Sequence, residues 1–164
     1  MYLREVSPRE LGELYAVREL IEPYAAERAA TMADAAQLER LRRSCDEFTE
    51  IAKRSDLKEW LGAPEHRRRL SMIDRDFHTT ILAAANNRVA QQFFENGQVI
   101  TLVVTWNHLK TDLSKVAARI RPSVKQHRQI YDAIRRRDPV AAKKAMRSHI
   151  SGMAKRVLAD LHDS

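Results

Sequence analysis

Four residues combine the chemistry of metal ligands with positions beside or on apolar helix faces. In LSMIDRDFHTTIL (70–82), Asp74 and His78 are four residues apart next to an apolar stripe, so both should project to one side of a helix, one turn apart. His127 and His149 each fall on the apolar stripe of a later helix. One carboxylate and three imidazoles suit a divalent first-row transition metal. Such an ion would also stabilise a carboxylate on a buried face.

Each of these residues also has an ordinary structural explanation. A single histidine on an apolar face is usually a hydrogen-bonded core residue, and Asp74 could cap a turn or pair with Arg75 or a nearby lysine. The coincidence of three such histidines with an acid in i, i+4 spacing makes a metal site as good an explanation as a hydrogen-bonded polar core, and the residue pattern alone leaves both open. The ligand types allow Zn, Ni, Mn, Fe or Co, and zinc is the ion we expect.

The elements that would position these residues are all helical. The chain has four glycines and five prolines, and no segment shows the alternating pattern of a strand. The sequence therefore predicts an all-α antiparallel bundle of six to seven helices with the metal site in its core. The predicted helices cover residues 8–31, 33–54, 68–85, 88–112, 122–137 and 139–161. A polar connector with a short helical turn is expected over 54–68.

Capping residues set the predicted boundaries. Ser7, followed by Pro8 and by Glu10 three residues on, is typical of a helix start. Asn86 suits a left-handed position, and Asn87 suits the N-cap of the next helix. Pro122 is predicted to begin one helix, and Asp138 with Pro139 to begin the last.

Composition narrows the class of protein. The 164 residues predict one domain, 1–164, with its own core. A single cysteine, Cys45, excludes an internal disulfide and fits a reducing cytoplasm, while no apolar run suggests a membrane partner. The net charge of +7 leaves direct nucleic-acid binding open. The basic clusters lack interleaved aromatic residues, however, which favours solvated helix faces.

Five segments together resemble a known family, the C-terminal ligand-binding (FCD) domain of FadR-type GntR-family transcription regulators. The resemblance covers essentially the whole chain and rests on the order and spacing of the segments. They are ELYAVRELIEPYAAERAA (13–30), DRDFH (74–78), ILAAANNRVA (81–90), QHRQIYDAI (126–134) and RRDPVAAKKAMRSHI (136–150). Three positions depart from the family pattern: Gln126 replaces a Glu, and Arg137 and Asn86 each replace a Gly.

The resemblance implies an all-α bundle with a metal held by one Asp and three His, here Asp74, His78, His127 and His149. It also implies a small carboxylate or hydroxy-acid effector that binds near the metal and alters how a homodimer holds DNA. Regulators of this kind read DNA through an N-terminal winged helix-turn-helix, which is missing from this chain. We therefore expect an effector-sensing and dimerisation domain.

An organic acid also needs a cationic partner. Arg18 lies on the inward stripe of the first predicted helix, although an ion pair with Glu22 would explain it equally well. Thr101 could hydrogen-bond the effector, and His108 is a weaker candidate ligand. Val17, Leu20 and Tyr24 form a second apolar face of the first helix, which predicts a homodimer. His66 and His162 are expected to be solvated.

The alternative function is a metal-dependent hydrolase built on a helical bundle. No general base is evident beside the four ligands, and the His-Asp dipeptide of helical phosphohydrolases occurs only at 162–163. We therefore expect a sensor rather than an enzyme.

Overall fold

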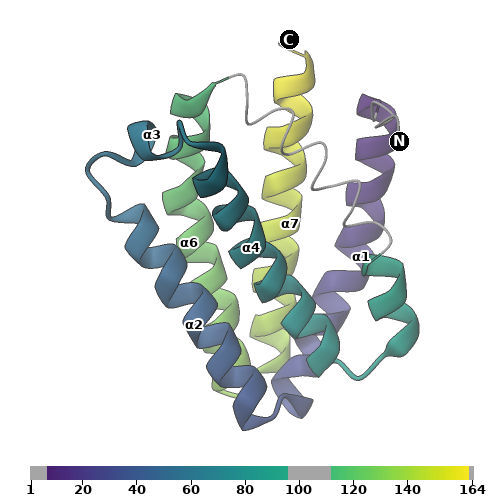
Figure 1. Cartoon of the computed structure of the whole chain (residues 1–164). Coiled ribbons are helices and arrows are strands. Elements are labelled where there is room, and N and C mark those ends of the chain that lie inside the picture. Colours follow the sequence, from purple (N-terminus) through teal and green to yellow (C-terminus); the bar gives the residue numbers. More distant parts are fainter. Residues whose placement is uncertain (1–6, 96–111, 163–164) are drawn as a thin grey trace.

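The computed structural model describes residues 7–95 and 112–162 of the chain. All regular secondary structure within these ranges is helical, which confirms the predicted fold class (Figure 1). The helices are α1 (Pro8–Met32), α2 (Ala35–Ala52), α3 (Leu57–Trp60), α4 (Pro64–Ala84), α6 (Leu113–Arg135) and α7 (Pro139–His162). Residues 88–95 are also helical.

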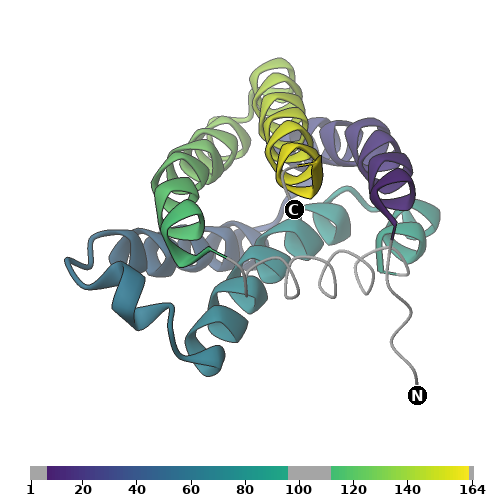
Figure 2. The same cartoon turned by 90° about the horizontal axis from the view of Figure 1, so that it is seen from above.

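The long helices form an antiparallel bundle. Helix α7 packs between α1 and α6 and runs opposite to both, while α2 packs against α4 and α6 (Figure 1). Seen from above, α6, α7 and α1 form one side of the bundle, and α2 and α4 lie across the other side (Figure 2). The predicted antiparallel arrangement is therefore confirmed, and α1, α4, α6 and α7 surround a common interior.

Small residues allow α1 and α7 to approach closely. Ala25, Ala26, Ala29 and Ala142 are fully buried in the main core, which also contains Met146. A second, smaller cluster of buried residues fills the space beneath α3. Its members come from α2, α3, α4 and α6 and include Phe48, Leu57, Leu61, Ile73 and Ile120.

Most of the predicted caps are present. Ser7 accepts a hydrogen bond from Glu10 N and completes a capping box at the start of α1. Asn86 adopts a φ of 52°, as predicted for a left-handed position, and Asn87 Oδ1 accepts from Ala90 N. Asp138 Oδ1 accepts from Ala141 N at the start of α7. Short polar side chains therefore satisfy the free N–H groups of these helix starts.

The prediction that Pro122 begins a helix is wrong. Helix α6 starts at Leu113, where Asp112 Oδ1 accepts from Ser114 N at 2.9 Å and from Lys115 N at 3.2 Å. Pro122 lies inside this helix and removes only the hydrogen bond to the Ala118 carbonyl. Burial of apolar residues on both sides of the proline offsets that loss.

The predicted start of the helix near residue 68 is also wrong, because α4 begins at Pro64. The buried Arg67 explains the difference. Its Nη1 donates to the carbonyls of Leu61 and Gly62 at 2.5 and 2.9 Å, which ties the first turn of α4 to the end of α3. The short helical turn predicted in the connector is confirmed as α3.

Candidate metal centre

The structure brings the four predicted ligands together. One ligand atom from each of Asp74, His78, His127 and His149 lies within 4.8 Å of all the others. Asp74 and His78 come from α4, His127 from α6 and His149 from α7. The i, i+4 spacing thus places two ligands on one helix, and the antiparallel packing supplies the other two.

The atoms of this group are oriented toward a common centre. Asp74 Oδ1 lies 3.4 Å from His127 Nε2 and 3.8 Å from His78 Nε2. The three histidine side chains are buried, but 39% of the Asp74 side chain is exposed. The expectation that Asp74 lies on a buried face is therefore met only in part: Asp74 lies at the edge of the apolar face, and the desolvation cost of its charge is smaller than a core position would impose.

Two partners fix the orientation of the imidazoles. Glu22 Oε2 of α1 lies 2.5 Å from His78 Nδ1, and Gln126 Oε1 lies 3.0 Å from His149 Nδ1. A proton on each Nδ1 leaves each Nε2 as a free electron-pair donor, the arrangement found for metal-bound histidines. Gln126 is the position where the family pattern has Glu, and its amide oxygen provides the same acceptor.

The buried nitrogens fit a metal ion. His78 Nε2 and both ring nitrogens of His127 have no hydrogen-bond partner among the described residues. Burial lowers the pKa of His127 and His149 well below the usual histidine value, and neighbouring histidines lower it further. A neutral imidazole with a free electron pair on a ring nitrogen is a suitable metal ligand. A buried ring nitrogen without any partner also lowers the stability of the fold. The donor set therefore matches a divalent transition metal.

Arg18 and Glu22 form a buried ion pair behind the ligands. Arg18 Nε lies 2.5 Å from Glu22 Oε1, and both side chains are buried. Burial by itself would raise the pKa of Glu22, but Arg18 and His78 hold that pKa at about 2. The Arg18 guanidinium also lies 5.1 Å from the centre of the Tyr15 ring. The inward position of Arg18 is confirmed. Its partner among the described residues is Glu22, as in the alternative explanation that the sequence offers for Arg18.

The sequence does not predict the contacts that Glu22 and Gln126 make with the imidazoles of the candidate site. Glu22 was assigned only as a partner of Arg18, and Gln126 only as a departure from the family. A sequence signal existed for Glu22, since an acid inside an apolar stripe needs a partner on another helix. Thr101 and His108, by contrast, lie outside the described residues.

His66 is half-buried, and its ring makes contacts that the prediction of a solvated side chain does not include. Its Nδ1 lies 2.7 Å from the Trp60 carbonyl oxygen, and its ring stacks on the Trp60 ring at 4.2 Å. The contact belongs to the α3–α4 turn, so it explains His66 without a functional role. Cys45 is buried, and burial raises the pKa of its thiol to about 12.

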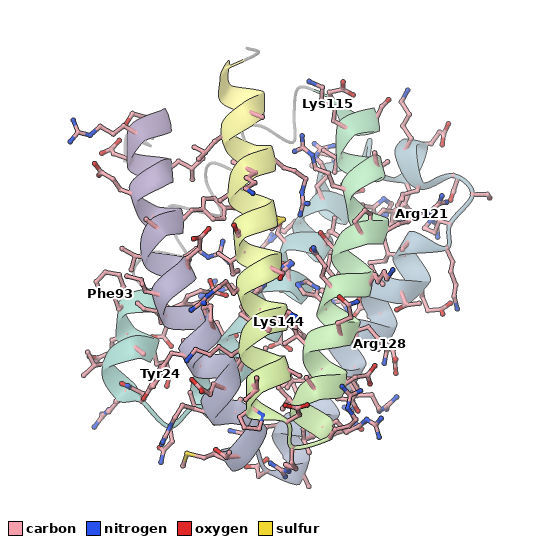
Figure 3. The ribbon with its side chains drawn as sticks, turned by 180° about the vertical axis from the view of Figure 1, so that it is seen from behind. Tyr24, Phe93, Lys115, Arg121, Arg128 and Lys144 are labelled. Carbon is pink, nitrogen blue, oxygen red and sulfur yellow. The ribbon has the colours of Figure 1, made fainter. Side chains whose placement is uncertain are left out.

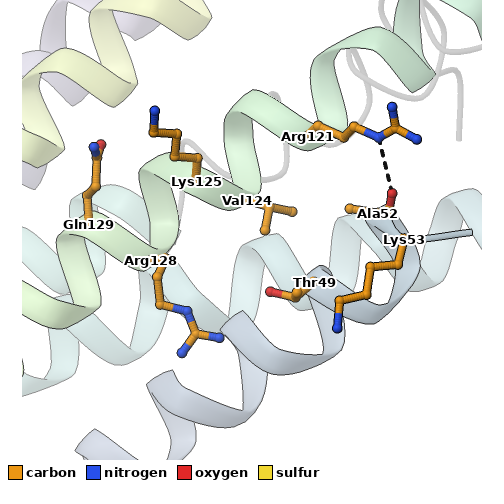
Figure 4. Close-up of a pocket in the computed structure, with 8 residues that line it drawn as sticks. All are labelled: Thr49, Ala52, Lys53, Arg121, Val124, Lys125, Arg128 and Gln129. Carbon is orange, nitrogen blue, oxygen red and sulfur yellow. Dashed lines mark hydrogen bonds between the residues drawn. The ribbon is translucent and has the colours of Figure 1, made fainter.

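A separate open groove of about 660 Å³ runs between α2 and α6 (Figure 4). Its lining includes Lys53, Arg121, Lys125 and Arg128, and none of the four ligands. Arg121 and Arg128 lie with Lys115 on the outer surface of α6 (Figure 3). Residues 112–164 hold 13 of the 29 lysines and arginines but only five of the 22 acids, so the positive charge is concentrated in this part of the sequence.

An all-helical bundle with one carboxylate and three imidazoles facing its interior defines the class of protein: an all-α domain with a candidate metal centre. A family model described as "FCD domain" matches residues 13–152. The chain belongs to the FCD domain family, which confirms the resemblance seen in the sequence.

The similar proteins are transcription regulators. The chain is 30% identical to the Glc operon transcriptional activator of Escherichia coli over 99% of this chain and 59% of that protein. It is 26% identical to the Galactonate operon transcriptional repressor of Escherichia coli over 93% of this chain and 60% of that protein. The solved structure of Streptococcus agalactiae GntR superposes with a TM-score of 0.66 at 25% identity, over 93% of this chain and 62% of that one.

The chain thus spans about three fifths of the length of these relatives. Among the residues that the structure describes, no helix has the length and apolar character needed to cross a membrane.

Proposed function

We propose that residues 1–164 act as a single effector-binding and dimerisation domain of a GntR-family transcription regulator. In this proposal Asp74, His78, His127 and His149 bind a divalent transition metal, with zinc as the preferred ion. The observation that carries it is the convergence of four ligand atoms within 4.8 Å, with Glu22 and Gln126 oriented behind two of the imidazoles. The metal would supply a Lewis-acidic centre with open positions for an oxygen ligand.

The proposed effector is a small carboxylate or hydroxy-acid. The relative named for the galactonate operon supports this class, since galactonate is itself a hydroxy-acid. The buried guanidinium of Arg18 contributes positive charge behind the metal centre, and Thr101 remains a proposed contact. Binding would change how the full-length protein holds DNA through a winged helix-turn-helix, in the cytoplasm and without a membrane partner.

Exposed apolar residues support the proposed homodimer. Leu20, of which 76% is exposed, and Tyr24 lie on α1, while Val89 and Phe93 lie on the neighbouring helical segment. Tyr24 and Phe93 lie on the same side of the molecule (Figure 3), and Asn87 Nδ2 donates to Tyr24 Oη at 3.4 Å. Val17, part of the predicted face, is half-buried. Several exposed apolar side chains on one side of a molecule are typical of a contact between subunits.

The metal site is tested by elemental analysis of the purified chain beside an Asp74→Ala/His78→Ala variant. We expect about one metal ion per chain, and a large loss in the variant. No metal in the wild-type chain, even after incubation with zinc or nickel, would refute the metal centre and leave the four residues as a polar core.

The effector and the non-catalytic role are tested on the metal-loaded chain. A thermal-shift screen of small carboxylates should raise the melting temperature, because a ligand that binds only the folded state stabilises it. Turnover of ester, phosphate or deamination substrates by the same preparation would instead support a metal-dependent hydrolase.

A further inference from the structure

Arg156 on α7 has buried hydrogen-bond donors that no group in the described residues accepts. Its Nε and Nη2 atoms are both buried and without a partner. These two atoms form one edge of the guanidinium, the edge that binds both oxygens of a carboxylate. Leaving two donors of a charged group unpaired costs free energy, so the edge is suited to an acceptor that the chain itself does not provide.

The position of the guanidinium places this edge near the metal centre. Arg156 follows His149 by seven residues, so the two side chains share one face of α7. The guanidinium folds back over Gly152, where an added Cβ would lie 3.3 Å from Arg156 Nη1. Gly152 is three residues from His149, a rise of about 4.5 Å along the helix. The cationic group therefore lies about one turn from a metal ligand.

Other charges in this region leave Arg156 without a partner. Arg18 is already paired with Glu22. Burial lowers the pKa of Arg156, and the positive charge of Arg119 lowers it further. Tyr15 is almost fully buried, and the positive charges of both Arg18 and Arg156 act to lower the pKa of its hydroxyl. An anion beside Arg156 would relieve both the repulsion and the unpaired donors.

We infer that one carboxylate of the effector binds at the metal centre and that Arg156 binds a second carboxylate, so that the domain selects dicarboxylic acids. This inference rests on the proposed function of the site. The charges support the class of ligand: with a divalent ion bound, only the carboxylates of Asp74 and Glu22 would offset that ion and the guanidiniums of Arg18, Arg156 and Arg119. The remaining charge is positive, and an acid with two carboxylates offsets more of it than a monocarboxylate does.

The experiment compares two four-carbon acids, succinate and butyrate, by isothermal titration into the zinc-loaded chain. We expect wild-type protein to bind succinate more tightly than butyrate. Arg156→Met should weaken succinate binding about 10- to 100-fold, the range for a lost charged hydrogen bond, and change butyrate binding less than about threefold. Zinc content should stay at the wild-type level, because Arg156 is not a ligand.

Two further variants separate recognition from folding and from general charge. Gly152→Ala adds a methyl group at the guanidinium, so it should weaken succinate binding while leaving the helix as stable or more stable. Lys155→Met removes an exposed charge from the adjacent position and should leave both affinities unchanged.

Each result decides the inference. Equal losses for the two acids in Arg156→Met, or no loss at all, would overturn the role of Arg156 while the proposed function stands. Wild-type protein that holds zinc but binds neither acid would overturn the proposed effector class as well. Wild-type protein that holds no zinc would refute the metal centre itself.

Discussion

Glu22→Gln is the substitution that most directly tests how the metal centre is built. The change keeps the shape of the side chain and removes its charge. Two consequences follow from the structure, because Glu22 contacts Arg18 through Oε1 and His78 through Oε2. The first is a loss of folding stability, and the second is a loss of metal affinity.

The size of each effect follows from burial. Removing one partner of a buried ion pair costs about 3–5 kcal/mol, and we expect the lower value because the amide oxygen of Gln can still accept from Arg18. A loss of about 3 kcal/mol lowers the melting temperature of a chain of this size by about 6–12 °C. Partners of metal-bound histidines contribute about 10- to 100-fold to metal affinity, so zinc should bind more weakly by that factor.

The assay is urea denaturation of the metal-free chain, followed by competition with a zinc chelator. Arg18→Met and the Arg18→Met/Glu22→Gln double variant complete a thermodynamic cycle. Glu19→Gln is the matched control, since Glu19 lies on the same helix and has no ion pair in the described structure. The control should change stability by less than about 0.5 kcal/mol.

A small coupling energy would refute this reasoning. If the two single losses add in the double variant to within about 0.5 kcal/mol, Arg18 and Glu22 do not act as a pair. If Glu22→Gln binds zinc as tightly as the wild type, the contact with His78 does not support the metal site.

Three other changes have defined outcomes. In the metal-free chain, burial lowers the pKa of His127 and His149, so below about pH 6.5 the unfolded state binds more protons than the folded state. The free energy of unfolding, measured by urea denaturation, should therefore be highest at pH 7.5 and fall at lower pH. The two histidines together should lower it by up to about 2.7 kcal/mol per pH unit. Arg137 has a φ of 58°, and Arg137→Gly should raise stability by up to about 1 kcal/mol in the same assay. Leu20→Asp or Phe93→Asp should convert a dimer into a monomer in light scattering without lowering zinc content, and an unchanged mass would show that this face is not the interface.

The helical period explains why the four ligands could be found in the sequence. Residues on the apolar stripes of the three packed helices α4, α6 and α7 must face one interior, so polar residues on those stripes meet there. The period does not specify how far around the helix a side chain at the stripe edge is covered. The sequence therefore predicts that Asp74 lies beside the three histidines but overestimates how deeply its side chain is buried.

Contacts between helices are harder to infer, because they depend on how far one helix slides along another. The approach of Glu22 to His78 requires α1 and α4 to pack at one particular register. No local pattern encodes that register. The prediction that Pro122 begins a helix is wrong for a different reason. Proline favours a first helical turn, but in α6 the Asp112 cap and the buried Val116 and Ile120 outweigh that preference.

The two faces of α1 connect the metal centre with the proposed subunit contact. Arg18 and Glu22 point inward from the same two turns that expose Leu20 and Tyr24. A helix moves as a nearly rigid unit, so a rotation that takes Glu22 away from His78 must also move Leu20 and Tyr24. If filling the metal centre favours one orientation of α1, it must change the dimer dissociation constant, and by linkage dimerisation must change metal affinity by the same factor. Equal shifts in the two constants would establish α1 as the coupling element, whereas a dimer constant unaffected by zinc would restrict Glu22 to a local role.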